Sequence, residues 1–112
     1  MREKSKKFAI EVVKLCRELQ AQKEFVLSNQ LLRSGTSIGA NLMEGEHAQS
    51  YADFLNKYNI SLKEANESKY WLELLYETGI IEKEKFTKLK DNCDELIRLL
   101  VASIKTMKTR KQ

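Results

Sequence analysis

Apolar residues recur at steps of three and four along four stretches of the chain, and short polar breaks separate these stretches. Such steps place side chains on one face of an α-helix, whereas a half-buried strand alternates at every second residue. The first stretch predicts a helix over about residues 4–20 with a mostly charged outer side. Its inward face comprises Phe8, Val12, Leu15, Cys16 and Leu19.

The second stretch predicts a helix over about residues 26–44. Its apolar face comprises Leu27, Leu31, Ile38 and Leu42. Gly35 and Gly39 oppose this helix, because each interior glycine costs about 1 kcal/mol relative to Ala. We therefore expect another backbone to pass very close to them and to offset that cost. Gly45 is placed to end the helix in the left-handed conformation.

The third stretch predicts a helix over about residues 50–77. Ser50 is suited to cap its start, and Asp53 lies near the positive end of the helix dipole. Gly79 is placed to end the helix, with Ile80 making the hydrophobic contact of a C-terminal cap. The core face comprises Tyr51, Phe54, Leu55, Tyr58, Leu62, Ala65 and Leu72.

The fourth stretch predicts a helix over about residues 82–108, with apolar positions close to a heptad repeat. These positions are Phe86, Leu89, Cys93, Leu96, Ile97, Leu100, Ile104 and Met107. Three short connections between four helices favour an up-down-up-down order. The sequence therefore predicts an all-α protein whose single domain, residues 1–112, is an antiparallel up-down-up-down four-helix bundle.

Composition agrees with one helical domain. The chain has 112 residues, no Pro and only 4 Gly, with 42% hydrophobic and 32% charged residues. This length supports a single core, and this composition is typical of helical bundles. The basic start of the chain lacks an apolar run long enough for a signal peptide or a membrane span. We therefore expect a cytoplasmic protein without a membrane partner.

The two cysteines are predicted to be core thiols. Cys16 and Cys93 both lie on apolar helical faces. If the first and last helices are antiparallel, the two residues are offset by roughly 10 Å along the bundle, at 1.5 Å per residue. A disulfide requires Cα atoms within roughly 7 Å, so the two thiols are expected to remain unpaired.

A second face of residues 26–44 carries almost only hydrogen-bonding groups. It comprises Gln30, Arg33, Ser37, Asn41 and Glu44. A merely solvated face is usually richer in Lys and Glu, so the stripe favours a buried contact; the alternative is a solvated stripe on an amphipathic helix. Arg33 is predicted to form a structural ion pair with Glu64 or Glu67 of the third helix, which fixes how helices or subunits meet.

The stretches QLLRSGTSIGANLMEGE and ADFLNKYNISLKEANESKYWLELL carry a family resemblance. They resemble the four-helix-bundle family first met as reading frames in intervening sequences of bacterial large-subunit ribosomal RNA genes. That family includes the accessory variability determinant of diversity-generating retroelements. The resemblance covers nearly the whole chain. It implies an antiparallel bundle that assembles as a ring, commonly a pentamer, with no established enzymatic activity.

The outer side of the third helix also favours an interface. Trp71 is expected to point away from the bundle centre, and subunit interfaces are enriched in aromatic anchors. The alternative is a skewed bundle that buries Trp71 internally. The predicted oligomer interface comprises Arg33, Ser37, Asn41 and Glu44 of the second helix, and Ile60, Glu64, Glu67, Trp71 and Leu74 of the third.

Enzymatic chemistry finds little support in the sequence. Glu44 and His47 have the Glu-x-x-His spacing of di-iron bundles, but His47 is the only histidine, so the second motif is missing. Ser34, Ser37 and Cys16 have no histidine at helical spacing to act as a base. Gly35 and Gly39 lack the Lys and Ser/Thr of a phosphate-binding loop. We therefore expect no catalytic residue, metal or cofactor, and a metal-binding bundle enzyme is the weakest alternative.

Basic charge falls on the first and last helices, with seven Lys/Arg and three acids in residues 1–23, and nine and five in residues 79–112. In the predicted topology both termini share one pole of the bundle. The predicted basic pole comprises Arg2, Lys4, Lys6, Lys7, Lys105, Lys108, Arg110 and Lys111. Such a cluster can neutralise phosphates of RNA or DNA. The alternative is that these residues only keep the protein soluble.

The sequence therefore favours a non-enzymatic homo-oligomeric scaffold, a pentamer by resemblance, that binds nucleic acid without sequence preference as an accessory factor. The nucleic-acid clause rests more on the resemblance than on the charge. Its partners are then other copies of the chain, RNA or DNA, and a reverse transcriptase or another protein. The alternative is a purely structural oligomer with a protein partner and no role with nucleic acid.

Overall fold

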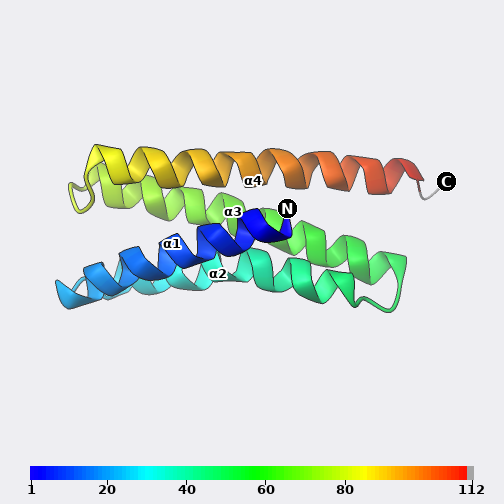
Figure 1. Ribbon diagram of the computed structural model, residues 1–112, viewed down its shortest axis with the longest axis horizontal. Helices are drawn as coiled ribbons and strands as arrows, with labels where there is room; N and C mark the ends of the chain where they lie inside the picture. Colours follow the sequence, from blue (N-terminus) through cyan, green and yellow to red (C-terminus); the bar gives the residue numbers. More distant parts are fainter. Residues whose placement is uncertain (111–112) are drawn as a thin grey trace.

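Four antiparallel helices form a bundle, which confirms the predicted fold class (Figure 1). The computed structural model describes residues 1–110. The helices are α1 (Arg2–Ala21), α2 (Val26–Glu46), α3 (Tyr51–Glu77) and α4 (Lys83–Arg110). Each helix packs against the two beside it: α1 against α2 and α4, and α3 against α2 and α4. Within residues 1–110, no helix is both long and apolar enough to cross a membrane.

Two predicted helix ends are confirmed. The Ser50 hydroxyl accepts a hydrogen bond from the Asp53 amide at 3.1 Å and so caps α3. After α3, Gly79 takes a left-handed φ of +79°. The Ile80 amide then donates to the Leu75 carbonyl at 2.9 Å, as in a glycine-terminated helix.

The prediction that Gly45 ends the second helix is wrong. α2 continues to Glu46, and Gly45 is buried inside it without a left-handed φ. A Cβ on Gly45 would lie 3.3 Å from the Cβ of Lys57. Gly45 therefore allows α2 and α3 to approach closely, and it does not make the turn. The left-handed residue near the start of α2 is Lys23, at φ 65°, in the connection from α1.

α1 makes the close contact expected at Gly35 and Gly39, and it does so mainly through side chains and not through its backbone. A Cβ on Gly35 would lie 2.9 Å from the Val12 Cγ1 atom. A Cβ on Gly39 would lie 3.2 Å from the Ser5 hydroxyl oxygen. Both distances are shorter than ordinary van der Waals contact, so α1 packs in a groove that only glycine leaves open.

The predicted core face of α1 is fully buried, and its cysteine side chain is part of it. In α4, the residues from Leu89 to Ile104 that were assigned to the core are also buried, except Ile97, which is half-buried. The face predicted for α3 is buried only in its second half, at Ala65 and Leu72. Its first half is only partly covered, at Tyr51, Phe54, Leu55, Tyr58 and Leu62.

This difference follows from the length of α1. The molecule is 50 Å long, whereas the 20 residues of α1 span about 30 Å at 1.5 Å per residue. Figure 1 shows α1 starting near the middle of the bundle, while α4 continues to the far end. The first residues of α3 therefore lie beside α2 and α4 but beyond α1.

Small buried polar residues line the contact between α2 and α3. The Ser68 hydroxyl donates to the Ser34 hydroxyl at 2.9 Å, and the Ser61 hydroxyl donates to the Ile38 carbonyl at 2.9 Å. All three serines are fully buried. The sequence analysis assigned none of them to the core, although Ser61, Ala65 and Ser68 follow a four-three spacing.

Candidate interaction surfaces

Arg33 joins α2 to two glutamates of α3, which confirms the predicted ion pair. Its Nη1 atom lies 3.0 Å from the Glu64 carboxylate, and its Nη2 atom donates to Glu67. The Arg33 side chain is 51% exposed, whereas that of Glu64 is only 8% exposed. The hydrogen bond to Glu67 raises the pKa of Arg33, and the charge of Glu64 adds to this. The pair lies within one chain and fixes the position of α3 against α2.

In the rest of the polar stripe on α2, Ser37 and Asn41 make bonds within the helix, and Glu44 binds α3. The Ser37 hydroxyl donates to the Arg33 carbonyl at 2.6 Å, and the Asn41 side chain donates to the Ser37 carbonyl at 2.9 Å. Glu44 accepts from the Lys57 ammonium at 3.0 Å. Ser37 and Asn41 are half-buried, and Gln30 is exposed. The sequence analysis missed Lys57, although it precedes Glu64 by one heptad on the same face of α3.

Trp71 lies between the two predicted alternatives, because its side chain is half-buried and packs against the edge of the core. Its ring contacts Tyr70 edge-on at 5.0 Å between centroids, and Tyr70 is 56% exposed. The Trp71 indole nitrogen is buried and has no hydrogen-bond partner within residues 1–110. Ile60 and Leu74 are likewise half-buried. We call the surface formed by these residues the α2–α3 face: Arg33, Ile60, Glu64, Glu67, Tyr70, Trp71 and Leu74.

The prediction of one shared basic pole is wrong, because α1 starts near the middle of α4. The Lys4 ammonium lies 3.1 Å from Glu95, and the Arg2 guanidinium lies 3.5 Å from Glu46. Arg110 is 15 residues beyond Glu95, or about 22 Å along the helix. The predicted set is therefore divided into a central group on α1 and a terminal group on α4.

The members of this set also differ in their partners. Arg2 and Lys4 are neutralised by acids of α2 and α4. The others within the described chain form no ion pair with any residue from 1 to 110: Lys6, Lys7, Lys105, Lys108 and Arg110. Lys111 lies outside the described residues.

Glu44 and His47, the residues with the spacing of a metal-binding motif, lie at the C-terminal end of α2. Glu44 is bound to Lys57, and His47 is exposed at the end of α2. Residues 1–110 contain no group of three or more His, Cys, Asp or Glu side chains placed to hold a metal.

Cys16 and Cys93 are free and buried, as predicted. Burial raises the pKa of Cys16 to about 11 and that of Cys93 to about 12, which keeps both thiols protonated.

The chain is similar to known proteins over most of its length. The model of the 23S rRNA-intervening sequence protein family matches residues 1–102. A solved structure of a protein of unknown function from the S23 ribosomal protein family of Bacteroides thetaiotaomicron VPI-5482 is 53% identical, with a TM-score of 0.90. The similarity covers 93% of this chain and 97% of that one. No curated protein matches. The chain therefore belongs to the 23S rRNA-intervening sequence protein family.

Proposed function

We propose that the chain is a non-enzymatic scaffold that assembles with copies of itself into a closed ring through the α2–α3 face. The observation that carries the proposal is Trp71. Its indole N–H is removed from water without an acceptor, although part of its ring is exposed. An aromatic ring that stays partly exposed at the edge of the core is apolar surface that a neighbouring subunit can cover.

The surroundings of Trp71 support a subunit contact. Tyr70 is exposed beside it, and Trp, Tyr and Arg are the residues most enriched at energetically important interface positions. Arg33 is held by Glu64 and Glu67 and so presents a fixed guanidinium edge at the same face. A closed ring needs a heterologous contact, in which this face of one copy packs against a different face of the next copy. The number five is what the family resemblance implies.

Assembly is tested by the molar mass in solution from light scattering. The wild-type protein is expected to have about five times the mass of one chain. Trp71→Ala is expected to weaken assembly by about 2 kcal/mol or more, as interface anchors do. Val26→Ala is the matched control, because Val26 is 73% exposed on α2 and is not part of the α2–α3 face. A wild-type protein that is monomeric at micromolar concentration contradicts the proposal.

The scaffold is also proposed to bind RNA or DNA weakly and without sequence preference. The support is the last part of α4, which has no acid after Glu95 and carries Lys105, Lys108 and Arg110. Copies in a ring repeat these cations, so many weak phosphate contacts add up. Sequence reading is expected to be poor because contacts between Lys or Arg side chains and phosphates carry no sequence information.

Binding is tested by fluorescence anisotropy with mixed-sequence RNA and DNA at two salt concentrations. Affinity is expected to fall by orders of magnitude as salt rises if six or more phosphates are neutralised. Replacing Lys105, Lys108, Arg110 and Lys111 by Ser is expected to abolish binding. Replacing Lys14, Arg17, Lys23 and Lys83 by Ser, which removes the same charge elsewhere, is the control. No binding at low salt leaves a purely structural scaffold with a protein partner, and unchanged binding in the first variant contradicts the proposed role of the α4 cations.

A further inference from the structure

The second half of α4 lacks the neighbour that covers its first half. α1 passes Glu95 near its own start, at Lys4. From Glu95 to Arg110, α4 continues for about 22 Å, or roughly four turns, without α1 beside it. Figure 1 shows this part of α4, coloured orange to red, beyond the N-terminus. The bundle therefore has four helices at one end and three at the other.

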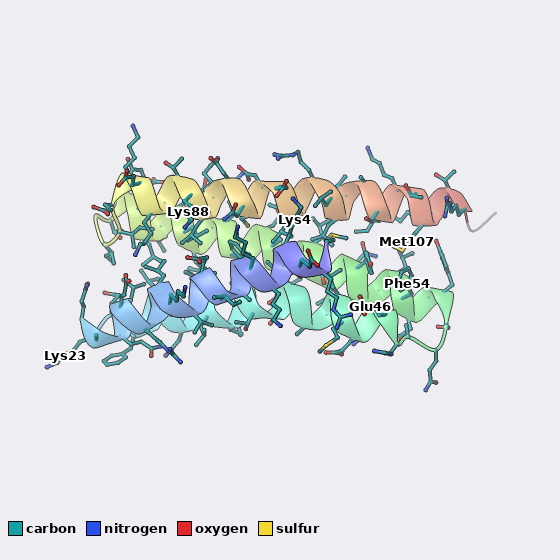
Figure 2. The ribbon with its side chains drawn as sticks, viewed as in Figure 1. Lys4, Lys23, Glu46, Phe54, Lys88 and Met107 are labelled. Atoms are coloured by element: carbon teal, nitrogen blue, oxygen red, sulfur yellow. The ribbon has the colours of Figure 1, made fainter. Side chains whose placement is uncertain are left out.

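An open groove of about 350 Å³ lies along this uncovered part. It is lined by Phe54, Tyr58, Leu99, Ala102, Ser103, Thr106 and Met107. Ala102 follows Glu95 by one heptad, so it lies on the side of α4 that faces α1 in the covered half. Figure 2 shows Phe54 and Met107 beyond Lys4 along the bundle. The groove is thus a continuation of the space that α1 occupies.

Charges along the seam between α1 and α4 indicate what matches this groove. In the covered half, the Lys85 ammonium lies 2.8 Å from Glu18, and the Lys88 ammonium lies 3.9 Å from Glu11. α1 therefore supplies acids to the lysines of α4. Beyond Glu95, every charged residue in the described part of α4 is a Lys or an Arg.

Three of these cations border the groove. Arg98 and Lys105 lie about one turn on either side of Ala102, and Arg110 lies one turn after Thr106. None of the three forms an ion pair with any residue in the described range, 1–110. A helix that lies in the groove and continues the line of α1 therefore suits these cations if it carries acidic side chains along its edges.

We infer that the groove binds an amphipathic helix of a partner protein, aligned with α1 and antiparallel to α4. Its apolar face covers Phe54, Leu99 and Met107, and its acidic residues face Arg98, Lys105 and Arg110. An apolar floor with charged edges is the usual arrangement when a helix binds in a groove. The length of four turns corresponds to a helix of about 15 residues.

Two other occupants fit less well. Single-stranded nucleic acid needs exposed ring faces for stacking, but the rings of Phe54 and Tyr58 pack against each other at 4.8 Å between centroids. The α2–α3 face, proposed above for the contact between copies, contains none of the residues that line the groove.

The test uses the full chain and a fluorescein-labelled probe peptide of about 16 residues. The peptide carries Leu at the four-three-one-three spacing of the α1 core face and Glu at the flanking positions. Saturable binding by fluorescence anisotropy is expected. Ala102→Glu with Thr106→Glu places like charges at the groove and is expected to weaken binding about tenfold or more. A peptide with Lys in place of Glu is expected to bind the wild type more weakly.

The matched control is Asn56→Glu with Asn59→Glu, which adds the same charge at exposed positions of α3 outside the groove. This variant is expected to bind the peptide like the wild type. Helical content by circular dichroism shows that both variants fold. Absence of saturable binding to the wild type, or equal loss in both variants, overturns the inference. A lower molar mass of the groove variant alone also overturns it, because a second copy then fills the groove.

Discussion

Of the glycines between α1 and α2, Gly35 leaves the least room for an added Cβ. An added Cβ would lie 2.9 Å from Val12, which is completely buried and branched at its own Cβ. Gly35→Ala gains about 1 kcal/mol of helix propensity but overpacks this contact by about 1–3 kcal/mol. We expect a net loss of about 1 kcal/mol, measured as a lower urea midpoint with an unchanged slope.

Ala40→Gly is the control for this prediction, because Ala40 is exposed on the same helix. It is expected to lose about 1 kcal/mol through propensity alone. A higher urea midpoint for Gly35→Ala shows instead that Val12 moves aside without cost.

Among single residues, the sequence identified two glycines on which helix packing depends but missed the small serines in the core. Gly35 and Gly39 were recognised because glycine inside a helix is unfavourable and needs a compensating contact. Ser34, Ser61 and Ser68 were missed because serine is usually exposed. Only the pairing of α2 with α3 shows that their hydroxyls find partners in the core.

At the scale of helices, two ion pairs connect α2 and α3 in different surroundings. Arg33→Ala leaves the buried carboxylate of Glu64 without its cation. We expect a loss of about 2 kcal/mol, as for hydrogen bonds to charged groups. Lys57→Ala removes a partner of Glu44, which is 56% exposed, so the expected loss is below about 1 kcal/mol. Thermal denaturation measures both, and equal losses contradict the ranking.

Asp94 connects α3 to α4 and makes their contact dependent on pH. Its carboxylate lies 2.9 Å from both Lys69 on α3 and Lys90 on α4. Burial acts to raise the pKa of Asp94, but the hydrogen bonds from Lys90 and Lys69 outweigh it, and the pKa is lowered. The stabilisation is therefore present above the pKa of an unfolded Asp, about 3.9, and is lost as the pH falls through the lower folded value.

We expect Asp94→Asn to be less stable than the wild type at pH 7. The difference should shrink as the pH falls below about 4 and vanish in stronger acid. Urea denaturation at a series of pH values measures it. A difference that stays constant down to pH 2 assigns the effect to packing.

Helix ends were predictable where the end has a local chemical cause. Ser50 and Gly79 act within one turn of chain, so the sequence identifies them. Gly45 looked like the same kind of signal. Its role depends on Lys57 of α3, which no local pattern reveals.

For the whole molecule, the four helices followed from periodicity and their directions from the short connections, but their relative positions along the axis followed from neither. The predicted basic pole assumed that the N-terminus of α1 and the C-terminus of α4 lie at the same level along the bundle. The contact of Lys4 with Glu95 shows a large offset. Core residues repeat every three to four positions, so shifting one helix by a heptad preserves the pattern and changes only which charges meet.

The short α1 also implies that the molecule opens unevenly. Amide exchange follows local unfolding, which is cheapest where few apolar groups are covered. We expect amides of residues 97–107 and 54–60 to exchange before those near Leu72 and Leu89, where four helices surround the core. Exchange followed by mass spectrometry at neutral pH measures this, and uniform protection along α4 contradicts it. The free energy of local unfolding of α4 then declines towards Arg110, and the bundle begins to unfold at that end.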